Sequence, residues 1–134
     1  FLCFMSFSAG ASRAAVALNA TYLKSVSARE LVRTCDEQPP LNLVNAATAL
    51  SKMARLSNDA HERLAPPVRL LERCTELIRG GSGLHPRQLS NALWGVAKLS
   101  ELRGGGLSRA ERECVASLFS ALCGCIRRAR PQEL

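Results

Sequence analysis

The sequence predicts an all-α protein in which stacked antiparallel helical hairpins form a short α-solenoid. Hydrophobic residues make up 47% of the 134 residues, but aromatic residues make up only 4%. Such a core consists mainly of Leu, Ala and Val, which suits closely packed helices better than strands. Apolar residues also recur at steps of three and four along several segments, which is the spacing of one helix face. In addition, one of these segments occurs twice.

The repeated segment reads LNLVNAATALSKM at residues 41–53 and RQLSNALWGVAKL at residues 87–99. A proline precedes the aligned leucines by three residues, at Pro40 and Pro86, and the same spacing returns at 131–134, so that the prolines are 46 and 45 residues apart. Proline is tolerated at the first position of a helix, where its missing N–H leaves no bond unmade. We therefore expect the second helices of successive hairpins to begin at Pro40 and Pro86. A hairpin alone cannot bury both faces of its helices, so the units are expected to stack.

Partner helices are expected around these two. Residues 1–26 are predicted to form an N-terminal helical extension, and residues 27–134 about two and a half hairpin repeats. Ser27-Ala-Arg-Glu30 is a capping box that predicts a short helix through about Cys35. A helix from Pro67 is expected to end at Gly80-Gly81. A second capping box, at Ser108-Arg-Ala-Glu111, predicts a helix through 126, with the next one beginning at 131.

Two matched positions carry polar or aromatic side chains of particular interest. Trp94 is predicted to lie in the core and fill the gap between adjacent hairpins, with Thr48 taking its place in the first copy. Asn45 and Asn91 recur early in the two matched helices. Their amides are expected to bond to a neighbouring helix or loop, or to be offered to a base edge.

The charge of the chain points towards a polyanionic partner. The formal net charge is +7, from 18 basic and 11 acidic residues, and all but three of the basic residues are Arg. Guanidinium groups bind phosphate in a bidentate manner, so this surplus favours nucleic acid or an anionic surface. The candidate RNA-binding residues occupy matched helix positions, one helix start and the basic C-terminal run: Lys52, Lys98, Arg87, Arg127, Arg128 and Arg130.

Other kinds of site find little support in the sequence. The six cysteines lack the spacing of a zinc site, and most fall at apolar helix positions, so that reduced and buried thiols are expected. The glycine-rich stretches lack the lysine pattern of a phosphate-binding loop. No metal, cofactor or catalytic activity is predicted. The apolar patch FLCFMSF is too short to span a bilayer, so no membrane insertion is expected.

The N-terminal region allows two interpretations. Residues 1–29 contain Arg13, Lys24 and Arg29 but no acidic residue, and they are rich in Ser and Ala. This is the composition of a mitochondrial or plastid transit region. An ordinary N-terminal helix that packs on its neighbour is the other interpretation, and both remain open.

The segment PRQLSNALWGVAKL, residues 86–99, resembles the second helix of octotricopeptide-type repeats, whose pattern is close to PQELSNxLWAxAKL. It is also similar to the repeats found beside RAP domains and in the FAST-kinase-like family. The resemblance implies an α-solenoid that binds RNA in an organelle. We therefore expect a non-catalytic structural protein of an organellar ribonucleoprotein that clamps rRNA backbone and docks on neighbouring proteins. The mitochondrial ribosome is the first choice, and the plastid is the alternative location.

Two other functions fit the same fold. One is a protein–protein scaffold or accessory subunit of an organellar membrane complex. The other is a free organellar RNA-processing or translation factor. Sedimentation combined with RNA cross-linking separates the three, because each places the protein in a different assembly.

Overall fold

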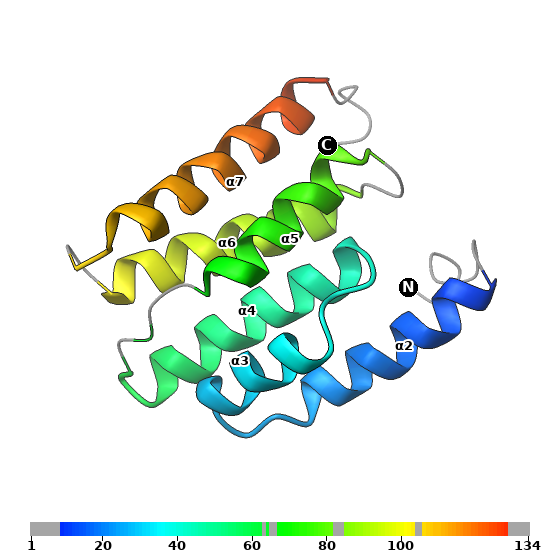
Figure 1. Cartoon of the computed structure of the whole chain (residues 1–134), viewed down its shortest axis with the longest axis horizontal. Helices are drawn as coiled ribbons and strands as arrows, with labels where there is room; N and C mark the ends of the chain where they lie inside the picture. Colours follow the sequence, from blue (N-terminus) through cyan, green and yellow to red (C-terminus); the bar gives the residue numbers. More distant parts are fainter. Residues whose placement is uncertain (1–8, 63, 65–66, 82–84, 104–105, 129–134) are drawn as a thin grey trace.

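The computed structural model describes residues 9–62, 64, 67–81, 85–103 and 106–128 (Figure 1). Within these ranges the secondary structure is helical and contains no strand, so the predicted all-α fold is confirmed. The elements are α2 (Ala9–Leu23), α3 (Ala28–Glu37), α4 (Leu43–Asp59), α5 (Val68–Arg79), α6 (Pro86–Arg103) and α7 (Arg109–Arg128).

The helices alternate between two layers. Helices α2, α4 and α6 run side by side in the same direction, and α3, α5 and α7 return in the opposite direction (Figure 1). We call the first set the B layer and the second set the A layer. The main contacts are α2 with α4, α4 with α6, and α5 with α7. Successive hairpins therefore stack as in an α-solenoid.

The prediction for the two proline-led helices is right in one copy and wrong in the other. Helix α6 begins at Pro86, as expected. Helix α4 begins at Leu43 rather than Pro40, because Asn42 accepts a hydrogen bond from the N–H of Asn45 at 2.9 Å and so caps the helix. The position that matches Asn42 in the second copy is Gln88, and glutamine is not among the favoured capping residues.

One predicted capping box forms completely and the other forms in part. The Ser108 hydroxyl accepts from the N–H of Glu111 at 3.2 Å, and the Glu111 carboxylate accepts from the N–H of Ser108 at 2.7 Å. Ser27 caps α3 in the same way, but the carboxylate of Glu30 accepts from the N–H of Val26 instead. Helix α3 runs two residues beyond the expected end at Cys35, and α7 two beyond 126.

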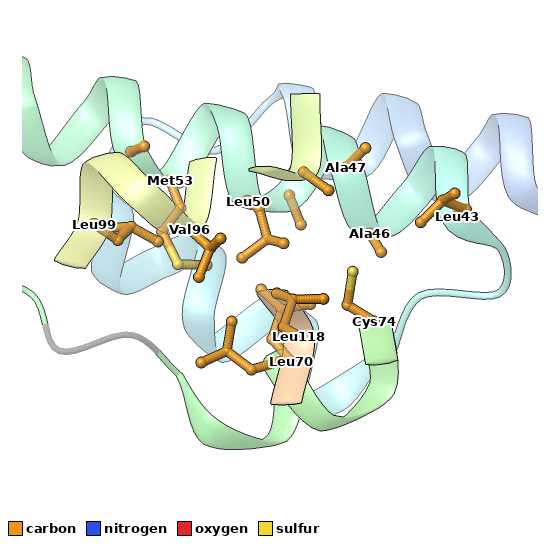
Figure 2. Packing of buried hydrophobic residues seen from close by; sticks show 14 of the residues in the cluster. Leu43, Ala46, Ala47, Leu50, Met53, Leu70, Cys74, Val96, Leu99 and Leu118 are labelled. Atoms are coloured by element: carbon orange, nitrogen blue, oxygen red, sulfur yellow. The ribbon is translucent and has the colours of Figure 1, made fainter. Parts of the chain in front are cut away.

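The core lies between the two layers. In Figure 2, Leu50 of α4 and Val96 of α6 approach Leu70 and Cys74 of α5 and Leu118 of α7. These side chains are buried, and each large aliphatic side chain that is fully buried contributes roughly 1.5–3 kcal/mol by leaving water. The small residues Ala46, Ala47, Ala49 and Ala92 are also fully buried. They let neighbouring B-layer helices approach closely.

Helix α2 is a third copy of the repeated helix, which the sequence comparison missed. Ala14-Ala15-Val16-Ala17-Leu18 matches Ala46-Ala47-Thr48-Ala49-Leu50 at an offset of 32 residues instead of 46. The buried positions agree with this register, because Ala15, Leu18, Tyr22 and Ser25 align with the buried Ala47, Leu50, Ala54 and Ser57. Helix α2 thus takes the same position relative to α4 as α4 takes relative to α6 in the B layer.

Candidate nucleic-acid interface

Each B-layer helix leaves part of its surface exposed. Helix α4 is covered on two sides by α2 and α6 and on a third by the A layer, so Thr48, Lys52 and Arg55 line the part that remains open. The matching positions on α6 are Trp94, Lys98 and Glu101, and none of them is buried. We call this surface the outer B face. It comprises Arg13, Val16, Ala20 and Leu23 of α2, Thr48, Lys52 and Arg55 of α4, and Arg87, Asn91, Trp94, Lys98 and Glu101 of α6.

The prediction that Trp94 fills the core is wrong, because this side chain is 46% exposed. Gly95 is the residue that meets α4. A Cβ atom at Gly95 would lie 2.7 Å from the carbonyl carbon of Leu50. Helices this close leave no gap for an indole ring, and one step of 100° around the helix turns Trp94 from that contact to the outer B face.

Lys52 faces the C-terminal end of α2. Its ammonium group donates a hydrogen bond to the carbonyl oxygen of Leu23, the last residue of α2. The last carbonyls of a helix have no partner within the helix and carry partial negative charge, so a cation there is stabilising. Lys52 therefore joins α4 to α2, and its ammonium group already has a protein partner.

Arg87 and Lys98 share the exposed stripe of α6 with Trp94. Arg87 is exposed in the first turn, where its backbone N–H donates to Nδ1 of His85 at 3.3 Å. The Lys98 ammonium lies 3.5 Å from the carboxylate of Glu101, and the Lys98 side chain is 26% exposed. A pair of this length at a solvent-exposed carboxylate contributes little. The weak pair with Glu101 leaves the Lys98 ammonium group available to bind another anion, such as a phosphate.

The C-terminal arginines belong to another part of the molecule. Arg127 is exposed near the end of α7, in the A layer, and so is not part of the outer B face. Arg128 ends α7, but its side chain lies outside the described residues, as does the whole of Arg130. The structure thus brings together Arg87 and Lys98 on α6, with Lys52 in the matching register of α4.

Sequence inspection missed two further cations of the outer B face. Arg13 is exposed at the α2 position that matches Asn45 and Asn91. Arg55 is exposed one turn after Lys52, and its guanidinium donates to the Ser51 hydroxyl at 3.3 Å. Helical spacing from Lys52 would have found Arg55. Arg13 needed the register of the third copy.

The balance of charge differs between the two layers. The B-layer helices carry six basic residues against two acidic residues, Asp59 and Glu101. The A-layer helices carry nine basic and seven acidic residues. Some of the A-layer charges pair within one helix, as in Arg73 with Glu76 at 3.4 Å and Arg109 with Glu113 at 3.1 Å. Both layers therefore carry a surplus of positive charge, and that of the B layer, four charges against two, is the larger.

One groove of the A layer is acidic. It holds about 370 Å³ between α5 and α7 and is lined by Glu72, Glu76 and Glu113, together with Arg79, Thr75, Cys114 and Ser117. Loss of solvation raises the pKa of the Cys114 thiol above its usual value, and the carboxylates of Glu72 and Glu113 raise it further. A raised pKa keeps the thiol protonated, whereas a nucleophilic cysteine needs a lowered one. Phosphate groups are disfavoured here by the same carboxylates.

The two matched asparagines have different surroundings. Asn45 is fully buried, donates to the carbonyl oxygen of Ala15 at 2.9 Å and to Oδ1 of Asn19 at 3.0 Å, and accepts from the N–H of Leu41 at 3.1 Å. The expected bond to a neighbouring helix is thereby confirmed for Asn45. Asn91 is exposed, and α6 begins three residues earlier in the repeat than α4. Asn91 therefore lies beyond the unpaired N–H groups of the first turn.

The cysteines follow the prediction in part. Cys35, Cys74, Cys114 and Cys123 are unbridged thiols, as expected. Cys35, Cys74 and Cys125 are buried, but Cys123 is exposed and Cys114 is half-buried. Cys3 lies outside the described residues. Within the described ranges, no group of three His, Cys, Asp or Glu side chains is placed to hold a metal ion.

The chain matches no protein-family model, no curated protein and no solved structure. The resemblance of residues 86–99 to organellar repeats therefore stays a prediction. None of the helices in the described part of the chain is both long and apolar enough to cross a membrane.

Proposed function

We propose that this protein is a non-catalytic RNA-binding component of an organellar ribonucleoprotein, with the mitochondrial ribosome as the first choice. The observation that carries the proposal is the charge of the B layer, whose helices contain six basic residues and only two acidic ones. Phosphate contacts supply most of the sequence-independent affinity for nucleic acid. The outer B face offers such contacts through Arg13, Arg55, Arg87 and Lys98.

The acidic groove of the A layer supports the same orientation. Carboxylates between α5 and α7 repel phosphates, so RNA approaches the opposite layer. The resemblance of residues 86–99 to organellar repeats supports the location and the class of partner. In this proposal, neighbouring proteins bind to surfaces outside the outer B face.

The proposal is tested by binding of a mixed-sequence RNA over a series of salt concentrations. We expect the affinity to fall linearly with the logarithm of salt concentration, and the slope to fall by about 0.7 for each phosphate contact removed from a single strand. Arg87→Ala with Lys98→Ala should therefore reduce the slope by about 1.4. Arg33→Ala, an exposed position of α3 in the A layer, is the matched control and should leave it unchanged.

A second variant tests the C-terminal arginines. Replacing Arg127, Arg128 and Arg130 with Ala should reduce the salt slope if these residues extend the RNA contact beyond the outer B face. Absence of RNA association at low salt in the unaltered protein contradicts the proposal. Sedimentation with RNA cross-linking in organelle extract tests the assembly, because a ribosomal component travels with a ribosomal subunit and a free factor does not.

A further inference from the structure

The exposed Trp94 side chain lies among polar and charged residues of α6. Its neighbours along the outer B face are Asn91 one turn before it, Lys98 one turn after it and Arg87 two turns before it. Apart from the small Ala97, the exposed residues that flank Trp94 on α6 are thus polar or charged. An aromatic ring that binds another protein normally lies at the centre of the interface, where Lys is depleted, whereas Trp94 lies one turn from Lys98.

The same arrangement suits an unpaired nucleotide. The face of an indole accepts a base by stacking, and cations beside it bind the phosphates of the same strand. A rise of 1.5 Å per residue puts Lys98 about 6 Å and Arg87 about 10 Å from Trp94 along the helix axis. Cations therefore lie on both sides of the ring.

We propose that Trp94 stacks on one unpaired base of single-stranded or looped RNA, while Lys98 and Arg87 hold phosphates on its two sides. This inference rests on the proposed RNA-binding function and adds the structural class of RNA. Bases inside a duplex have their faces covered by their neighbours, so the ring cannot reach them. The Asn91 amide, exposed on the same stripe, lies where it can bond to a base edge or to the ribose.

The geometry also limits what the site reads. Stacking accepts every base, because each has a π-face. In the matching positions of the other helices stand Thr48 and Val16, which offer no ring. A single stacked base with phosphate contacts predicts preference for unpaired RNA over duplex RNA, with little dependence on sequence.

The only tryptophan of the chain makes the test direct. The full chain is titrated with an unpaired oligonucleotide, a duplex of equal length and inorganic polyphosphate, while the Trp94 fluorescence is followed. We expect quenching by the unpaired RNA and much less by the duplex or by polyphosphate, which has no bases. Equal quenching by all three probes overturns stacking, since charge alone then accounts for the signal.

Three variants complete the test. Trp94→Leu keeps apolar volume but removes the ring face, and should weaken binding of the unpaired RNA by about tenfold. Trp94→Phe keeps a ring and should lose less. Val26→Ala removes an exposed apolar side chain outside the outer B face and should change nothing. Circular dichroism shows whether each variant retains its helical content.

The outcomes separate this inference from the proposed function. If RNA binds with the expected salt dependence but Trp94→Leu binds as tightly as the unaltered protein, stacking is wrong and the RNA-binding function stands. If no RNA binds at low salt, both are wrong. If duplex and unpaired RNA bind equally tightly and neither affinity changes in Trp94→Leu, the outer B face binds only the RNA backbone and stacking is wrong.

Discussion

Gly95 lies directly against the backbone of Leu50. A Cβ atom at Gly95 would be 2.7 Å from the Leu50 carbonyl carbon and 2.9 Å from both its oxygen and its Cβ. The contact joins α6 to α4, the helix pair that carries the repeated sequence. The matching position in α4 is Ala49, which is fully buried. This close approach sets the spacing of the B layer and, by leaving no room for an indole, turns Trp94 outwards.

We expect Gly95→Ala to destabilise the fold. Alanine in place of glycine stabilises a helix interior by about 1 kcal/mol. Overpacking against a neighbouring helix, however, costs about 1–3 kcal/mol. The neighbour here includes backbone atoms, which cannot rotate away, so the cost lies in the upper half of that range. After the gain in helix propensity, a net loss of about 1–2 kcal/mol is expected. Urea denaturation measures it as a lower midpoint.

The control for this substitution is at Ala97, two residues along and exposed. Ala97→Gly should cost about 1 kcal/mol through helix propensity alone. Alanine is thus expected to be the better residue at 97 and the worse residue at 95. A Gly95→Ala variant with a raised midpoint would show that α4 and α6 are further apart than the contact with Leu50 implies.

We expect the hydrogen bonds of Asn45 to hold α2 against α4. Asn45→Ala removes two hydrogen bonds to α2 and leaves the N–H of Leu41 without its acceptor. Loss of a buried polar partner costs about 1–3 kcal/mol, so the unfolding free energy should fall by about 2 kcal/mol. Asn91→Ala, at the matching but exposed position, should change it by less than about 0.5 kcal/mol. Equal effects at the two positions would contradict the difference in burial.

The sequence was sufficient for the fold class and for most helix starts. Apolar spacing, the two capping boxes and the proline at 86 depend on residues within one turn of each other, so local chemistry decides them. The start of α4 was wrong because two local signals compete, and the side chain of Asn42 outweighs Pro40. The role of α2 was missed because its match to α4 has a shorter offset than the match of α4 to α6.

The candidate site was less accessible from the sequence. Sequence inspection placed Arg87 near the start of α6, and the register of the repeat paired Lys98 with Lys52. The sequence could not show that Leu23 ends α2 beside Lys52, because that contact joins residues 29 positions apart. Nor could it show that Trp94 is exposed, since this follows from how closely Gly95 lets α6 approach α4.

Lys52 and Lys98 should therefore behave differently despite their matched positions. Lys52→Met removes the cation from the C-terminal end of α2 and should lower the unfolding free energy by about 1 kcal/mol. Lys98→Met breaks only a long surface pair with Glu101 and should cost less than about 0.5 kcal/mol. In RNA binding the order reverses, with Lys98→Met reducing the salt slope more than Lys52→Met. A larger stability loss at Lys98 would contradict these assignments.

The buried thiols should make the fold less stable in alkaline solution. Burial raises the pKa of the Cys35 thiol to about 11, an effect reduced by the Tyr22 hydroxyl, and raises that of Cys74 to about 12. The unfolded chain loses these protons near the ordinary thiol value of about 8.5, while the folded chain keeps them. Above that pH the unfolded state binds fewer protons, so stability falls as pH rises, until the folded thiols ionise as well.

Where the unfolded thiol is ionised and the folded thiol is not, each thiol contributes up to about 1.4 kcal/mol per pH unit. The measurement is the urea unfolding free energy between pH 9 and 11, comparing the unaltered chain with a Cys35→Ala, Cys74→Ala variant. The variant starts from a lower stability because alanine leaves space in the core, but the change with pH does not depend on that offset. We expect a shallower decline in the variant because it lacks both thiols and because burial and, to a lesser extent, Cys35 raise the pKa of Tyr22. Parallel declines would show that neither thiol keeps its proton in the folded state.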